Sequence, residues 1–152
     1  MSEKPNVPDV KHTVERLIEN GSQFDVEVLD RIYHEQLRIV HIDETGTVST
    51  LNRAENIALF REARDSGAET LSTNAEFDCV GADTGEGGVL VTRRMRSQVR
   101  PEKSIFSIRL VQGDGRWQVI HETAFVQPMA DCFPVENPRV QVIPADSRRR
   151  YR

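Results

Sequence analysis

The sequence of 152 residues has few of the features that assign a chain to a specialised class. It holds two cysteines, Cys79 and Cys132, which lie far apart and in no CxxC arrangement. This spacing argues against a disulfide framework or a zinc site, and we expect two free thiols with a structural role. Lysine and arginine number 20 against 24 for aspartate and glutamate, so the formal net charge of -4 does not predict nucleic-acid binding.

Long apolar runs are also missing from the chain. No stretch approaches the about 20 residues that cross a bilayer, and MSEKPNVPDV lacks the apolar core of a secretory signal. We therefore expect a cytoplasmic protein with no membrane partner. Hydrophobic residues make up 38% and charged residues 29%, which is typical of a globular chain, and the length suits one domain.

Apolar residues recur at helical spacing in the first part of the chain. The first predicted helix ends at NGS (20–22), and a second one, capped by Ser22 or Asp25, runs to about residue 34. A third helix begins at Asn52, because Glu55 three positions later completes a capping-box pattern. The stripe of the first helix consists of Val10, Val14, Leu17 and Ile18. The buried side of the third helix is expected to consist of Ile57, Leu59, Phe60 and Ala63.

The remainder of the chain has the composition and the period of β-strands. LRIVHI (37–42) and TVSTL (47–51) flank the turn DETG (43–46) and predict a hairpin between the second and third helices. Later strands are separated by GADTGEGG (81–88) and by RPEK (100–103). These later strands are predicted at 71–79, 89–99 and 104–111, followed by a last strand from about Trp117.

The last hairpin, GDGRWQVIHETAF (113–125), decides which residues share a face of the sheet. With Gly113 and Asp114 at the tip, the facing pairs are Leu110 with Trp117, Ile108 with Val119, and Phe106 with His121. Glu122 then lies on the opposite face from His121, so only one of the two faces a cavity. Both faces carry apolar residues, and three helices cover only one of them. We therefore predict a homodimer through the outer face of the sheet.

This order of elements resembles the nuclear transport factor 2-like (NTF2-like) superfamily. The resemblance rests on FDVEVLDRIYHEQLRIVHIDETGTVSTLNRAENIALF (24–60) and GDGRWQVIHETAFVQP (113–128), and it is nearest to the polyketide cyclase-like branch named for lumazine binding. It implies a single α+β domain over 8–128. In that fold three N-terminal helices pack on a strongly curved antiparallel sheet and form a cone-shaped apolar pocket. Residues 129–152 are predicted to be an extended proline-rich tail, since 128–152 holds four of the seven prolines.

The resemblance also suggests where chemistry would lie. In ketosteroid isomerases the base ends the first strand, a position that matches His41, and the two oxyanion donors match Val14 and Ser107. A valine cannot donate and a serine donates weakly, so steroid isomerisation is disfavoured. Three hypotheses remain: a binding protein for a small apolar or aromatic molecule; an isomerase, dehydratase or cyclase that uses His41 with Glu122 or His121 as acid–base pair; and a dimeric interaction module with a vestigial pocket.

Each candidate site residue also has a structural interpretation. His41 can also be a hydrogen-bonded core histidine, and His121 can lie with Trp117 and Phe106 on the face of the dimer. The candidates for holding an anionic ligand are Arg93, Arg94 and Arg96, of which Arg94 and Arg96 share a face; the alternative for all three is a charge-balanced strand edge. No HxH or HExxH spacing is present, so we predict neither a metal nor a cofactor. The ligand-binding residues predicted for the pocket are Tyr33, Phe60, Arg94 and Ser107.

Overall fold

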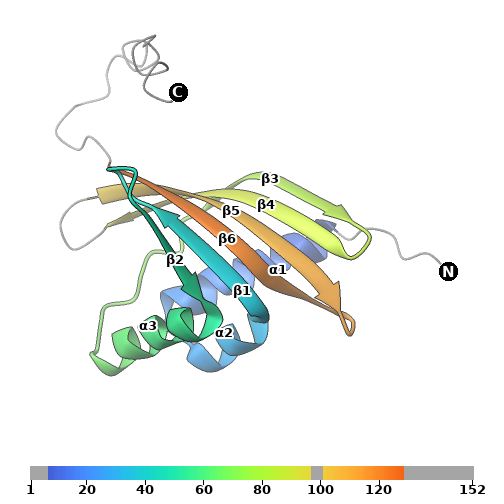
Figure 1. Cartoon of the computed structure of the whole chain (residues 1–152), viewed down its shortest axis with the longest axis horizontal. Coiled ribbons are helices and arrows are strands. Elements are labelled where there is room, and N and C mark those ends of the chain that lie inside the picture. Colours follow the sequence, from blue (N-terminus) through green and yellow to red (C-terminus); the bar gives the residue numbers. More distant parts are fainter. Residues whose placement is uncertain (1–6, 97–100, 129–152) are drawn as a thin grey trace, which may run out of the picture.

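Six strands form one mixed sheet, and three helices cover one of its faces (Figure 1). The structure is a computed structural model that describes residues 7–96 and 101–128. Strand order is β2-β1-β6-β5-β4-β3, and every ladder is antiparallel except β1 with β6. The predicted α+β fold class is confirmed. The elements are α1 (Val7–Ser22), α2 (Val26–Ile32), β1 (Tyr33–Ile42), β2 (Val48–Asn52), α3 (Arg53–Asp65), β3 (Glu76–Asp83), β4 (Glu86–Arg96), β5 (Pro101–Gly113) and β6 (Arg116–Pro128).

The helices begin where the capping residues predict. The Asp25 side chain accepts a hydrogen bond from the Val28 backbone and caps α2. Asn52 and Glu55 form a reciprocal capping box at the start of α3, with both N···O distances at 2.9 Å. The expected buried side of α3 is wrong at one position, because Leu59 is 52% exposed.

Helix α1 lies close against strand β4. Val10 is fully buried, and a Cβ atom added to Gly87 would lie 2.8 Å from its Cγ2. A side chain at position 87 would force Val10 to shift, so Gly87 allows the close approach of the helix layer to the sheet at this point.

Two expectations about β3 are wrong. The strand begins at Glu76 rather than at residue 71, because the Leu71 backbone bonds to the Ser22 carbonyl at 2.9 Å instead of to a neighbouring strand. It also continues through Gly81 and turns only at Thr84 and Gly85. Cys79 on this strand is a free thiol, as expected, but it is exposed, whereas a cysteine with a structural role is usually buried. Cys132 and the predicted tail lie outside the described residues.

The predicted register of the last hairpin is wrong in two ways. Its tip is Asp114 and Gly115, both at positive φ as a two-residue turn requires, so that Gly113 faces Arg116. A bulge then shifts the pairing by one more residue, because Ile120 has no partner between the pairs Leu110 with Val119 and Arg109 with His121. After the bulge the facing pairs are Arg109 with His121, Ile108 with Glu122 and Phe106 with Ala124.

Large apolar side chains also lie on the outer face of the sheet. Val48, Ile42 and Phe125 follow one another in register across β2, β1 and β6, and Phe125 is 42% exposed. Leu90 is also on this face, with 39% exposure. The predicted homodimer would bury these side chains. None of the helices in 7–96 or 101–128 is long and apolar enough to cross a membrane.

Candidate functional site

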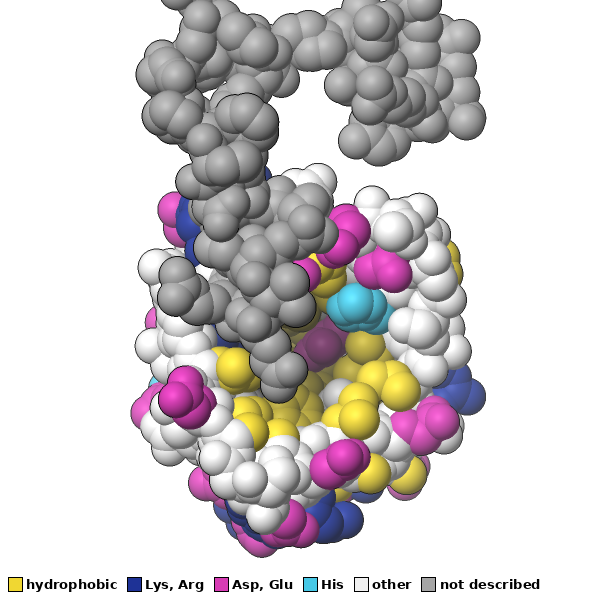
Figure 2. Space-filling model, turned by 90° about the vertical axis from the view of Figure 1, so that its left-hand side faces the viewer, with side chains coloured by type: hydrophobic (Ala, Val, Ile, Leu, Met, Phe, Trp, Pro, Cys, Tyr) yellow, Lys and Arg dark blue, Asp and Glu magenta, His cyan; other side chains and the backbone are white. Residues whose placement is uncertain are grey.

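A cavity of about 490 Å³ opens between the sheet, α1 and α3. Figure 2 looks into its mouth, where hydrophobic side chains surround a hollow with an acidic side chain in its depth and a histidine at its edge. The volume lies within the range of small-molecule sites. The apolar lining consists of Leu17, Ile18, Ile39, Leu51, Leu59, Phe60, Leu71, Val91, Phe106, Ile108 and Ala124.

A buried carboxyl and a buried phenol meet in this cavity. Glu122 comes from β6 and is 7% exposed, and Tyr33 comes from the start of β1 and is 3% exposed. The Tyr33 hydroxyl donates to Glu122 Oε1 at 3.5 Å. Because of the bulge at Ile120, Glu122 faces the helices together with Val119, which it would not do in an unbroken strand.

The apolar surroundings shift the pKa of both groups. Burial raises the pKa of Glu122 from 4.5 to about 7, against the opposing effects of the Tyr33 hydrogen bond and the Arg93 charge. Burial also raises the pKa of Tyr33 well above its ordinary value of 10.0, and the Glu122 charge raises it further. At neutral pH the phenol therefore keeps its proton, while the carboxyl is present in both its protonated and its ionised form.

Two further polar side chains flank this pair. Arg93 of β4 is 9% exposed, and its Nη2 donates to Ser22 Oγ at 3.2 Å and to the Ser72 carbonyl. Burial lowers the pKa of the Arg93 guanidinium, whereas the electrostatic interactions with Glu122 and, to a smaller extent, Tyr33 raise it. Asn56 of α3 is 7% exposed and approaches the Tyr33 phenol closely enough to lower its pKa, although its Nδ2 has no partner within hydrogen-bond limits.

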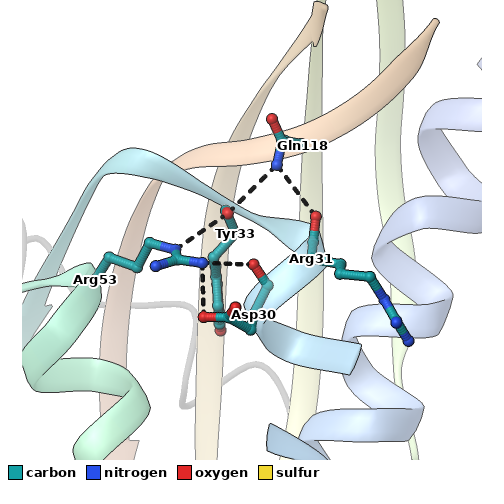
Figure 3. A network of polar contacts seen from close by, with 5 residues as sticks. All are labelled: Asp30, Arg31, Tyr33, Arg53 and Gln118. Atoms are coloured by element: carbon teal, nitrogen blue, oxygen red, sulfur yellow. Dashed lines mark hydrogen bonds and ion pairs between the residues drawn. The ribbon is translucent and has the colours of Figure 1, made fainter. Parts of the chain in front are cut away.

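A polar network fixes the backbone that carries Tyr33 (Figure 3). Arg53 of α3 donates from Nη2 to the Asp30 carbonyl and to Asp30 Oδ1, both at 2.6 Å, and from Nε to the Tyr33 carbonyl at 3.4 Å. Gln118 of β6 donates to the carbonyls of Arg31 at 3.1 Å and Tyr33 at 3.5 Å. Arg53 and Gln118 thus satisfy the last carbonyls of α2 from two sides. This network fixes the position at which the Tyr33 phenol enters the cavity.

The structure brings some of the predicted site residues to the cavity and leaves others outside it. Tyr33, Phe60 and Glu122 line it, and His41 lies at its exposed mouth, opposite Ser49 in the ladder. His121 pairs with Arg109 on the outer face, away from Phe106. Two others lie elsewhere: Arg94 forms a surface ion pair with Glu76 at 3.2 Å, and Ser107 is exposed on the outer face.

The sequence did not single out Asn56, and it indicated Arg93 only together with Arg94 and Arg96, with Arg94 chosen for the pocket; a signal existed for both residues. Arg93 continues the alternation of Val89 and Val91, two buried residues of β4, so the period of two places it inward and Arg94 outward. Asn56 precedes Phe60 by four positions and therefore shares its helix face.

Comparison with known proteins supports the fold but does not assign a function. No family model matches the chain, and no curated protein matches it. Solved structures do. An NTF2-like protein of unknown function from Silicibacter pomeroyi superposes with a TM-score of 0.64 at 15% identity, over 80% of this chain and 95% of the other. An NTF2-like protein from Cytophaga hutchinsonii gives a TM-score of 0.62 at 19% identity, over 82% and 99%.

A ketosteroid isomerase-like protein from Erwinia carotovora atroseptica gives a TM-score of 0.57 at 9% identity, over 79% of this chain and 95% of the other. At these identities the likeness defines the fold alone. The chain therefore has the NTF2-like fold, and its function must be argued from the cavity.

Proposed function

We propose that the cavity binds a small, mostly apolar molecule and that Glu122 exchanges a proton with it. One observation carries the proposal: a carboxyl with a pKa of about 7 lies buried in an apolar cavity beside a phenol that stays protonated. Acid–base catalysis is most effective when the pKa of the group is near the working pH. The open volume argues against a vestigial pocket.

The chemistry that suits this arrangement is proton transfer next to a carbonyl group. The ionised Glu122 accepts a proton from the carbon beside the carbonyl, and the electron pair of the broken C–H bond moves to form an enolate. In a β,γ-unsaturated ketone, Glu122 returns the proton to the γ-carbon of the dienolate and an isomer forms. In a β-hydroxy ketone, Glu122 instead gives the proton to the departing hydroxyl group, which leaves as water while the double bond forms. The Tyr33 phenol donates to the Glu122 carboxylate and stabilises its charged form.

Exchange of the α-protons of 2-tetralone, an apolar two-ring ketone, tests this function in deuterated water by NMR. We expect the protein to accelerate exchange by about 10²–10⁴ over buffer, with a rate that rises with pH through about 7. Glu122→Gln should abolish the acceleration, because an amide accepts no proton at this pH. Full activity of Glu122→Gln would contradict the assignment.

His41→Asn separates the two candidate bases. His41 lies at the exposed mouth, so we expect the variant to keep exchange within about threefold of the parent. Loss of exchange in His41→Asn with retention in Glu122→Gln would make His41 the base.

Binding without catalysis is the second candidate function. The predominantly apolar lining favours it, since a ligand would be held mainly by burial of its own apolar surface. Saturable binding of 2-tetralone without faster exchange would support this function. The sequence resemblance to the branch named for lumazine binding stays a prediction and does not identify the ligand.

A further inference from the structure

Arg93 places a permanent positive charge in the wall of the cavity. Its side chain is 9% exposed, and the hydrogen bonds that it makes to described residues all leave from Nη2 and reach two neutral oxygens, Ser22 Oγ and the Ser72 carbonyl. Its Nε has no partner, and it forms no ion pair within the described part of the chain. A buried charge without a counter-ion is unfavourable. A ligand that brings an anionic group next to Arg93 therefore gains more binding energy in this cavity than it would from the same ion pair in water.

The surroundings of Arg93 leave this charge only partly compensated. The titratable residues that line the cavity with it are Tyr33, His41 and Glu122, and the neighbours from α1 and the chain before β3 are the uncharged Ser22 and Ser72. Tyr33 keeps its proton, and Glu122 is neutral below a pH of about 7. In that range Arg93 is the only buried charge among the described residues of the lining.

We propose that the natural ligand is an apolar carboxylic acid that also carries the carbonyl group required by the proton transfer, with its carboxylate against the Arg93 guanidinium and its hydrocarbon body filling the cavity. The proposal rests on the function proposed above and specifies its substrate class. A single carboxylate matches a single guanidinium, whereas a phosphate would bring a second charge that no further cation of the described lining compensates. The Nη1 nitrogen, which bonds to no described residue, is the donor available to the ligand.

Two probes of equal shape test the substrate class: 2-naphthoate and the uncharged 2-naphthamide. Calorimetry at a pH of about 6 should show naphthoate bound at least about tenfold more tightly than naphthamide. The preference should fall as the pH is raised to about 8.5, because ionised Glu122 then compensates Arg93 and repels the probe. In Glu122→Gln this contribution is absent, so the preference should fall less with pH than in the parent, and His41→Asn in the same background removes the other titratable group of the lining whose charge changes in this range.

Arg93→Gln should reduce the preference to about parity while naphthamide affinity stays within about threefold. Arg94→Gln is the matched control, since it removes the neighbouring charge outside the cavity and should keep the full preference. Because Arg93 also holds Ser22 and Ser72, circular dichroism must show that the variant is folded. If Arg93→Gln does not fold, the pH dependence of the naphthoate preference, compared between the parent and Glu122→Gln, tests the carboxylate inference instead.

The outcomes distinguish the two proposals. Equal binding of the two probes by the parent protein, or a preference that survives in folded Arg93→Gln, would overturn the carboxylate inference and leave the binding function standing. Binding of neither probe at millimolar concentration would contradict the binding function and the inference together.

Discussion

The buried carboxyl of Glu122 makes the stability of the protein depend on pH in a predictable direction. A group with a pKa of 4.5 in the unfolded chain and about 7 in the folded chain binds its proton more tightly when folded. The folded state therefore carries more protons between these two values, and stability decreases as the pH rises through this window. The stabilising effect is fully present below about pH 4.5 and is lost above about pH 7.

The size of the effect follows from the same two values. At about 1.4 kcal/mol for each pH unit, the rise of the pKa from 4.5 to about 7 corresponds to about 3.4 kcal/mol, of which about 2.5 kcal/mol is lost between pH 5 and pH 8. Glu122 is nearly inaccessible to solvent, at 7% exposure, so no large discount for screening applies. The contribution of Glu122 is a large fraction of the free energy of unfolding of a typical domain, which is roughly 5–15 kcal/mol.

Glu122→Gln isolates this contribution, because glutamine has the shape of the protonated acid and does not ionise. Urea unfolding should show the variant more stable by less than about 1 kcal/mol at about pH 5 and by about 3 kcal/mol at about pH 8. Exposed groups such as Asp43 and Glu27, whose pKa values are lowered, titrate in both proteins and cancel in the difference. A difference that does not change between these two pH values would refute the reasoning.

Three further predictions concern the packing of α1, the outer face of the sheet and the thiol. Gly87→Ala should lower the free energy of unfolding by about 1–3 kcal/mol, because the added methyl group meets Val10. Gly88→Ala is the control: its methyl group would have its nearest neighbour at 3.8 Å and should change stability by less than about 1 kcal/mol. Equal costs for the two variants would contradict the close approach of α1 to β4. Light scattering should give about twice the chain mass of 17.3 kDa. Phe125→Asp, which places a charge on the outer face, should give a folded monomer. A parent protein that is monomeric at every concentration would exclude the dimer. Native protein should react rapidly with a thiol reagent at exposed Cys79. Cys79→Ser should lower the number of thiols that react per chain by one and leave only the expected thiol of Cys132; an unchanged number would contradict the assignment.

Local signals predicted the elements of this fold well. The capping box joins Asn52 to Glu55, and the apolar stripe of α1 joins residues such as Val10 and Val14. Each of these patterns involves residues only three or four positions apart, so it can be recognised in the sequence alone. The resemblance to the NTF2-like superfamily then predicted how helices and sheet are arranged, and the structural neighbours bear out that fold.

The wall of the cavity was harder to predict because it depends on register. The bulge at Ile120 has no mark in the sequence, yet it decides that Glu122 shares a face with Ile108. Arg94 was selected over Arg93, although one position along a strand reverses the face. The expectation that either His121 or Glu122 faces the cavity, but not both, agrees with the observed positions, with Glu122 inside.

The most direct test of the central claim is an NMR titration of the carboxyl carbon of Glu122, labelled with ¹³C at its side chain and assigned by the loss of its signal in Glu122→Gln. The account predicts a midpoint at about pH 7, set by burial and opposed by Tyr33 and Arg93. A midpoint near the ordinary value of 4.5 would mean that water reaches the carboxyl freely, and it would contradict the claim that an apolar cavity holds an acid–base group at this position.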